Sequence, residues 1–248
     1  MDKNNEPEYR YFQFPLCLLQ NVIINPKNVF SEPQKGFNLI IDYSIVDLAK
    51  KKYADISGLH SQIHYAAEFL NVNIGSIDDM IEQYEQAETL IRAHEGKYGT
   101  DPYLGIGTSL LFEFRDKQNH NETELLCALI AIRSLIGQRK FTGTYKSVIL
   151  MRMIGAKSKK ALKKCLQQKT LKLVHNKYSK RYQMDKLIAK LVNRKFIQSK
   201  ISFNRQIFFS TKLDMQELGN EIIRYINNKD IKRKEREARQ RIKEATKK

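Results

Sequence analysis

The chain is poor in cysteine and has no metal-binding cysteine pattern. Its 248 residues include three cysteines, Cys17, Cys127 and Cys165, which are widely spaced and contain no CxxC pair. An odd, scattered set of this kind indicates neither a disulfide framework nor a zinc ribbon. Because Cys127 and Cys165 lie among apolar residues at helical spacing, we expect both to be small core residues.

Long apolar runs are also missing. The longest clean run, residues 125–132, is far too short to cross a bilayer. Residues 1–10 are polar and partly acidic, unlike the basic start and apolar stretch of a secretory signal. With 42% hydrophobic residues and no long Gly, Ser or Pro stretch, the sequence predicts a folded, soluble, cytoplasmic protein without a membrane partner.

Acidic residues are nearly absent from one long stretch. Residues 125–213 contain 22 Lys and Arg residues and a single acidic residue, Asp185. The first 120 residues instead hold 11 basic and 17 acidic side chains, so the net charge of +17 belongs to the rest of the chain. A compositional bias of the genome would enrich both halves in lysine, so the asymmetry favours a surface that binds a polyanion.

The charge change near residue 120 predicts an acidic, helical N-terminal domain over residues 1–120. Its most distinct helix is expected at residues 76–94, where Ser76 can act as N-cap and Asp79 lies near the positive end of the helix dipole. Other expected elements are an extended segment at 11–19, helices at 37–54 and 57–70, and a glycine-rich loop at 96–107.

A basic domain is predicted over residues 121–213. It opens with a core helix over 121–138, in which Asn121 can cap and Glu124 can reach back to it, and which ends at Gly137. A β-prone run at 140–144, a helix at 145–154, a turn at Gly155 and a Ser158-capped basic helix at 159–168 follow. Helix, glycine turn and basic helix are typical of a helix-turn-helix.

A second basic helix is predicted further along the same domain. Ser179 can cap a helix to about Arg194, with Met184, Leu187 and Leu191 on its apolar face. Two β-prone runs at 196–202 and 206–212 come next, joined by a turn at 203–205. A basic helix followed directly by a basic hairpin indicates a recognition helix followed by a wing.

In this order of elements, residues 121–213 resemble the winged helix-turn-helix superfamily, whose members mostly bind duplex DNA. The resemblance implies that the helix at 179–194 enters the major groove and that Lys200, Asn204 and Arg205 lie on the wing. The closing run 207–213, followed by a helix near Asp214, is similar to the end of winged domains in phage and plasmid replication or partition proteins.

A second register is open. If the helix at 159–168 is the recognition helix, residues 171–175 and 178–182 become the wing. We favour the downstream register because the hairpin after Arg194 is better formed. The predicted nucleic-acid-binding residues of both registers are Lys159, Lys160, Lys163, Lys164, Lys177, Lys180, Arg181, Gln183, Lys186, Lys190, Asn193, Arg194, Lys200, Asn204 and Arg205.

Catalytic and metal sites are not indicated. The basic domain offers one carboxylate, Asp185. It lies within the first two turns of the downstream helix, where the helix dipole stabilises a negative charge, so we expect it to serve the fold. His60, His64 and Glu68 share one helix face but lack the glutamate of an HExxH motif, which favours an ordinary polar face. We predict no catalytic residues, no metal and no cofactor.

The last part, residues 214–248, is expected to be a highly charged, exposed helix. It is interpreted either as an additional arm that contacts phosphates or as a solubilising tail. Neither interpretation is favoured by composition.

The sequence therefore predicts a mainly α protein with a small β-hairpin that binds duplex DNA without catalysis. A regulator, replication accessory or partition protein of a mobile element fits best. Two alternatives are an RNA or single-strand binder, in which Tyr178, Tyr182 or Phe203 would stack on bases, and a helical adaptor with a basic face. For Tyr182 helical spacing favours a core position.

The acidic domain is predicted to mediate self-association or to bind a protein partner. Its charge also suggests that it competes with DNA for the basic face. On that hypothesis, deletion of residues 1–120 should tighten DNA binding.

Overall fold

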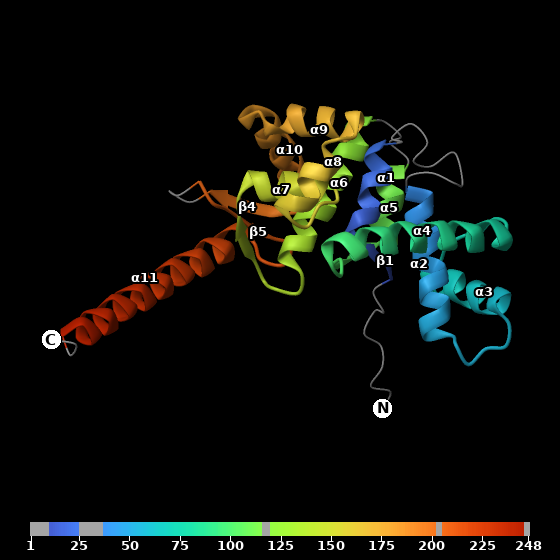
Figure 1. Cartoon of the computed structure of the whole chain (residues 1–248), viewed down its shortest axis with the longest axis horizontal. Helices are drawn as coiled ribbons and strands as arrows, with labels where there is room; N and C mark the ends of the chain where they lie inside the picture. Colours follow the sequence, from blue (N-terminus) through green and yellow to red (C-terminus); the bar gives the residue numbers. More distant parts are fainter. Residues whose placement is uncertain (1–9, 25–36, 116–119, 202–204, 246–248) are drawn as a thin grey trace.

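The protein is mainly α-helical and carries two small antiparallel sheets (Figure 1), which confirms the predicted fold class. The computed structural model describes residues 10–24, 37–115, 120–201 and 205–245. The helices before residue 120 are η1 (Leu16–Leu18), α1 (Leu19–Ile24), α2 (Phe37–Lys52), α3 (Leu59–Leu70), α4 (Ile77–Tyr98) and α5 (Thr108–Arg115). The later ones are α6 (His120–Ile136), α7 (Lys146–Met153), α8 (Lys159–Cys165), α9 (Lys169–Ser179), α10 (Arg181–Asn193) and α11 (Met215–Ala245).

The first sheet joins β1 (Tyr11–Pro15) to β2 (Tyr103–Gly107), with Phe12 opposite Ile106. Beside it, α2 packs against both α3 and α4. The ring of Tyr43 on α2 stacks on Tyr84 of α4 at a centroid distance of 5.3 Å. The predicted helices of this part are therefore confirmed, and α2 contacts both the acidic helix α4 and β1.

Two predictions for this part need correction. The extended segment expected at 11–19 ends at Pro15 and continues as η1 and α1. The loop expected at 96–107 is instead the last turn of α4 followed by β2. Pairing with β1 overrides the poor strand propensity of the glycines.

The start of α4 agrees with its predicted cap. The backbone N–H of Asp79 donates a hydrogen bond to the Ser76 hydroxyl at 3.3 Å. Acidic side chains therefore lie where the dipole of α4 favours them.

The central helix is α6, which is buried at every position from 125 to 132. A helix that is apolar all round packs on several sides, and α6 contacts α1, β2, α7 and α10. Cys127 lies fully buried in it, as predicted, whereas Cys165 on α8 is half-buried. Because one hydrophobic cluster runs through both parts, the boundary at residue 120 stays a prediction.

The second sheet has the strand order β3-β5-β4. Its strands are β3 (Thr142–Thr144), β4 (Gln198–Ile201) and β5 (Ile207–Ser210), and Gln198 pairs opposite Ser210. The predicted hairpin after α10 is thus confirmed with shorter strands. Its turn residues Phe203 and Asn204 lie outside the described residues.

Helix α9 was not expected in the favoured register, and it contradicts the wing of the other register. Leu171, Val174 and Tyr178 are buried along it, at the spacing of a helix and not of a hairpin. The predicted cap at Ser179 is also wrong, since Ser179 ends α9 and its hydroxyl donates to the Asn176 carbonyl at 3.0 Å. Lys180 precedes α10 instead, with extended backbone and no side-chain cap.

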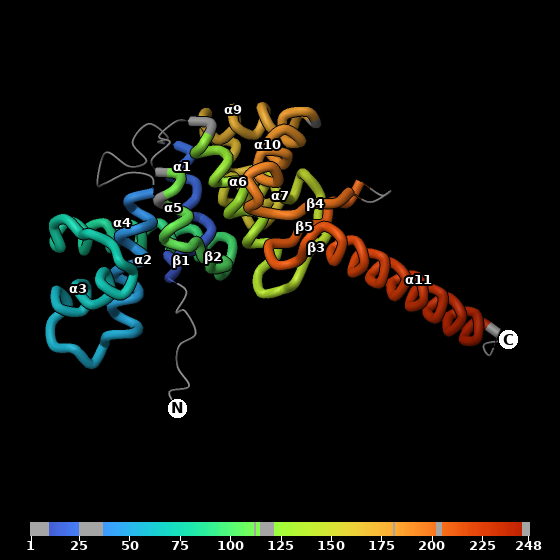
Figure 2. The backbone as a smooth tube through the Cα atoms, turned by 180° about the vertical axis from the view of Figure 1, so that it is seen from behind, coloured from blue at the N-terminus to red at the C-terminus, as the bar shows by residue number. Residues whose placement is uncertain are grey.

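The last helix, α11, begins as predicted. Asp214 accepts hydrogen bonds from the backbone N–H groups of Gln216 and Glu217, both at 2.8 Å. Figures 1 and 2 show α11 leaving the body of the protein beside β4 and β5. Within the described residues the predicted charged tail is one long, exposed helix.

The turn between α7 and α8 requires a glycine. Gly155 has φ +77°, and an added Cβ would lie 2.8 Å from Gln20 Cγ and 3.1 Å from the Leu16 carbonyl oxygen. We expect Gly155→Ala to lower the free energy of unfolding by roughly 2–4 kcal/mol, because the strain of a positive φ adds to a clash with backbone. Urea denaturation measures this loss.

Gly137→Ala is the matched control for that substitution. Gly137 also has a positive φ, +56°, but nothing lies within 4 Å of the added Cβ. It should cost only the backbone strain of about 1–2 kcal/mol. Equal losses for the two variants would show that the contact with η1 and α1 does not constrain the turn.

Candidate nucleic-acid interface

The outward face of α10 carries the main group of predicted binding residues. Lys186, Lys190 and Asn193 are exposed on it, and Gln183 is half-buried beside them. Neither Lys186 nor Lys190 has an acidic partner within the described part of the chain. On the inward face of α10, Met184, Leu187 and Leu191 are buried. Lys180 is exposed at the start of the helix, and nothing is described of the Arg181 side chain.

Tyr182 lies on this outward face rather than in the core. Its side chain is 65% exposed, so the prediction of a core position was wrong. The Lys186 ammonium lies 4.2 Å from the centroid of its ring. The side chains that point inward are Met184 and Leu187, one turn apart, and Tyr182 is out of phase with them.

Two predicted binding residues are instead engaged in the fold. The Arg194 guanidinium donates two hydrogen bonds to the Glu122 carboxylate, at 2.5 and 2.7 Å, and this pairing raises the pKa of Arg194. The Lys177 ammonium lies 2.5 Å from a carboxylate oxygen of Glu124. Both cations neutralise acids on α6, so we correct their assignment from binding to stabilising contacts.

Glu124 joins α6 to α9. Its predicted capping partner, Asn121, has a side chain outside the described residues. Only 2% of Glu124 is exposed. The Tyr178 hydroxyl donates a hydrogen bond to the Glu124 carboxylate oxygen that also pairs with the Lys177 ammonium. Burial raises the pKa of Tyr178. A carboxylate this deep in the core is stable because it has a cation and a hydroxyl beside it.

Asp185 lies within the first two turns of α10, as predicted, and has an ion-pair partner that the sequence did not reveal. It lies in the second turn of α10, away from the free N–H groups where a helix dipole acts most strongly. Its carboxylate forms an ion pair with Lys146 at the start of α7. The single acid of the basic stretch therefore ties α7 to α10 and leaves the outward face of α10 positive.

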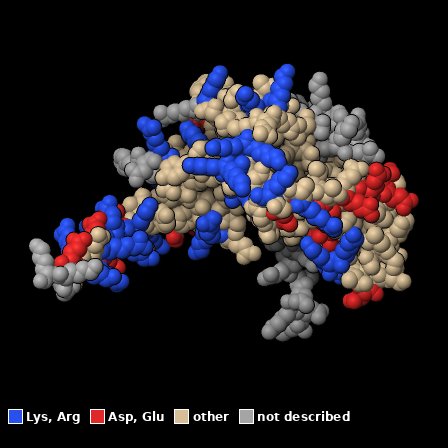
Figure 3. Space-filling view, in the orientation of Figure 1, with Lys and Arg blue, Asp and Glu red and all other residues tan. Residues whose placement is uncertain are grey.

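A second basic surface lies on α8. Figure 3 shows Lys and Arg side chains gathered over α7 and α8, and Asp and Glu side chains gathered over α4. The Ser158 cap of α8 is confirmed by a hydrogen bond from Ala161 N–H at 3.2 Å. The four predicted residues of this helix are all exposed: Lys159, Lys160, Lys163 and Lys164.

The N-terminal part adds to this second surface, which sequence reasoning missed. Lys97, in the last turn of the acidic helix α4, contacts Lys164, and this contact and the charge repulsion lower the pKa of Lys164. Lys157 donates hydrogen bonds to the carbonyls of Gly99 and Thr100, just beyond α4. Only the packing of α8 beside α4 brings these lysines together.

The hairpin β4–β5 and its turn, the predicted wing, carry Lys200 and Arg205, both exposed. Lys200 extends from β4 toward α11, where its ammonium lies 2.9 Å from the position that a Cβ on Gly219 would take. Arg205 has a positive φ of 57° beside the turn. Lys200 thus places its charge beside the start of α11.

One cluster of metal-ligand residue types occurs among the described residues. Ligand atoms of Cys17, His94 and Asp101 lie within 4.8 Å of one another. Burial raises the pKa of the Cys17 thiol, and the Asp101 carboxylate accepts the Cys17 N–H at 2.6 Å. Burial lowers the pKa of His94, and the nearby Lys157 charge lowers it further. The hydrogen bond between Asp101 and the Cys17 N–H joins η1 to the segment after α4.

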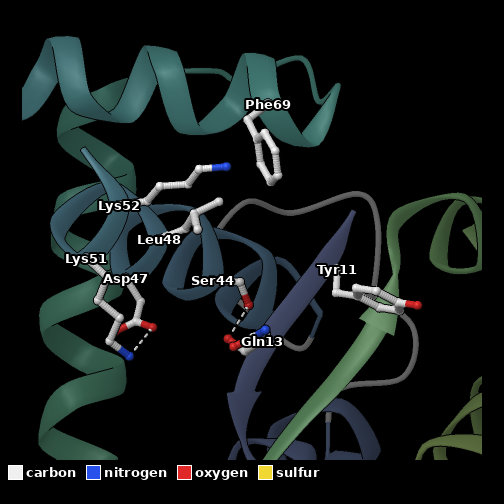
Figure 4. A pocket seen from close by; sticks show the side chains of 8 residues that line it. All are labelled: Tyr11, Gln13, Ser44, Asp47, Leu48, Lys51, Lys52 and Phe69. Atoms are coloured by element: carbon white, nitrogen blue, oxygen red, sulfur yellow. Dashed lines mark hydrogen bonds and ion pairs between the residues drawn. The ribbon is translucent and has the colours of Figure 1, made fainter. Parts of the chain in front are cut away.

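A pocket of about 250 Å³ lies in the N-terminal part (Figure 4). Within it Asp47 accepts a hydrogen bond from the Lys51 ammonium at 2.7 Å, and the Lys52 ammonium lies 3.4 Å from the Phe69 ring centroid. The Ser44 hydroxyl is directed to the Gln13 carbonyl at 2.9 Å. Because these polar groups engage one another, they do not converge on the space of the pocket.

The three histidine and glutamate residues of α3 are all exposed. His60 lies 3.3 Å from the Asp78 carboxylate, and His64 and Glu68 border an open surface hollow. This is the polar helix face that the sequence favoured.

The chain matches no family model, no curated protein and no solved structure. In the described part of the chain, none of the helices combines the length and the apolar character that a membrane span needs.

Proposed function

We propose that the protein binds duplex DNA through the outward face of α10 and the wing, without catalysing a reaction on it. One observation carries this proposal. The face of α10 with Lys186, Lys190 and Asn193 lacks acidic partners among the described residues and leads directly into the hairpin β4–β5. A basic helix of this kind fits the major groove, while a hairpin beside it reaches the backbone.

The winged helix-turn-helix resemblance supports this choice of register. The strand that follows α10 pairs with β5, whereas the helix α8 is followed by another helix, α9. A role as regulator, replication accessory or partition protein of a mobile element is the corresponding biological proposal. The N-terminal part would then serve self-association or a protein partner.

A single-stranded nucleic acid is the second candidate. The exposed ring of Tyr182, with the Lys186 ammonium 4.2 Å from its centroid, offers a stacking surface next to a positive charge. Base–aromatic stacking of this kind contributes about 1–3 kcal/mol per base.

Fluorescence anisotropy with duplex DNA, single-stranded DNA and RNA of one sequence tests the proposal. We expect the tightest binding to the duplex and a dissociation constant at least several-fold higher for the other two. A preference for single strands that Tyr182→Ala abolishes would replace the proposal by the second candidate. No binding to any of the three would favour an adaptor with an acidic protein partner.

A further inference from the structure

The long helix α11 is fixed to the body of the protein by its first turns only. Leu218 and Ile222 are buried against Phe208. One turn further on, the Tyr225 ring packs edge-on against Phe141 and Phe208, at centroid distances of 6.1 and 5.9 Å. Every described position from 223 to 244 is exposed, and Figure 2 shows this part of α11 extending away from the rest of the chain.

The face of α11 that packs on the sheet continues as an unbroken row of basic residues. Leu218, Ile222 and Tyr225 are spaced by four and three residues, and the same alternation carries on beyond them. We call the following five residues the basic stripe: Lys229, Lys232, Arg236, Arg239 and Lys243. At 3.6 residues per turn they lie within a sector of about 80° and extend over about 21 Å.

Between Lys229 and Lys243 the acidic residues are Asp230, Glu235 and Glu237, and all three lie outside the sector of the stripe, with Glu235 at its edge, about 40° beyond Arg239. Asp230 and Glu237 follow stripe residues by one position, which turns them about 100° away. Both are close to Arg233, at 3.6 and 3.8 Å. Within the described residues Lys232, Arg236 and Arg239 have no ion pair, so their charge is available to a ligand.

The stripe also borders a groove. A hollow of about 800 Å³ lies between α11 and the second sheet, with Gln206 and Phe208 on the sheet side and Lys229, Lys232 and Arg236 on the helix side. Asp230 lines it too, beside its partner Arg233. The groove therefore connects the wing to a row of positive charges.

We propose that the basic stripe of α11 is a second phosphate-binding element, which holds the backbone of the same duplex that α10 and the wing contact. This inference rests on the proposed function. A duplex carries one negative charge per about 1.7 Å of its axis, so a row of about 21 Å faces many phosphates. Cations spaced by three and four residues along one face match such a repeating charge, whereas a neutral occupant would leave Lys232, Arg236 and Arg239 without counter-charges.

A second copy of α11 fits this face poorly. In a helix pair the positions spaced by three and four residues form the contact, and here they would bring like charges together. The charge of the stripe therefore favours binding of a polyanion.

Two variants with equal loss of charge test the inference in the full-length chain. Lys232→Gln with Arg239→Gln removes two stripe charges seven residues apart. Lys234→Gln with Arg241→Gln removes the same two residue types at the same spacing from the opposite face, where both are exposed. Duplex affinity is measured by anisotropy between about 50 and 300 mM salt.

We expect the stripe variant to raise the dissociation constant on the order of 10-fold at about 0.15 M salt and to flatten the slope of log affinity against log salt by about 1.8. The off-stripe variant should change affinity less than about threefold and leave the slope unchanged. If the wild type binds and the two variants change its affinity equally, or neither changes it, the inference is overturned. Absence of binding by the wild type would instead contradict the proposed function.

Discussion

Replacing Lys186 and Lys190 by glutamine is expected to weaken duplex binding on the order of 10-fold or more at about 0.15 M salt. Both lysines are exposed, one turn apart, on the face of α10 that carries no acid partner among the described residues. Loss of two phosphate contacts would reduce the salt slope by about 1.8. Circular dichroism should show unchanged helix content, because the inward face of α10 is untouched.

The matched control is on α8. Lys160 and Lys164 are also exposed lysines one turn apart, and changing both to glutamine removes the same charge from the other basic surface. We expect less than about a threefold effect on duplex affinity. A larger loss of duplex affinity in the α8 variant than in the α10 variant would indicate that the binding surface lies on α8 and the adjoining Lys97. It would contradict the register that we favour.

Glu124→Ala is expected to be strongly destabilising, in the same range as Gly155→Ala. It would leave the Lys177 ammonium and the Tyr178 hydroxyl without their acceptor, in a contact that joins α6 to α9. Breaking a fully buried ion pair costs roughly 3–5 kcal/mol, but the Lys177 side chain is 39% exposed and can be solvated, so we expect a loss of roughly 2–4 kcal/mol, part of it from the buried Tyr178 hydroxyl. For a chain of this length that lowers the melting temperature by about 10 °C, which thermal denaturation measures.

A triple variant separates the broken pair from the lost volume. Glu124→Leu combined with Lys177→Met and Tyr178→Phe replaces the whole polar group by apolar side chains of similar size. Such replacements are often neutral, so most of the stability should return. If the single variant loses less than about 1 kcal/mol, the pair does not hold α9 to the core.

Local signals in the sequence predicted several elements well. Ser76 and Ser158 both act as caps, and the hairpin after α10 forms, because caps and alternating apolar residues act over a few positions only. The element α9 was missed because its apolar residues are few and lie among lysines, and because it takes its stability from packing on α1 and α7.

The sequence predicted the positive charge of the candidate site but not the ion-pair partners of its residues. Glu122 and Glu124 stand next to the basic stretch in sequence, yet they engage Arg194 and Lys177, which follow 72 and 53 residues later. No periodicity reports such a long-range contact. The contribution of Lys97 to the surface on α8 was hidden for the same reason, since it belongs to an acidic helix.

The structure also changes one experiment suggested by the charge asymmetry. Deletion of residues 1–120 would remove α1 and β2, both of which pack on the central helix α6. The truncated chain would expose the apolar residues of α6, so a change in affinity would not report competition by the acidic part.

The most direct test of the account is the salt dependence of duplex binding by the whole chain. If about six phosphates are neutralised, log affinity should fall against log salt with a slope of roughly −5, and it should do so at every duplex sequence tested. A slope near zero would contradict the account, because a surface of lysines on α10, the wing and α11 cannot bind DNA without releasing the counterions condensed on the DNA.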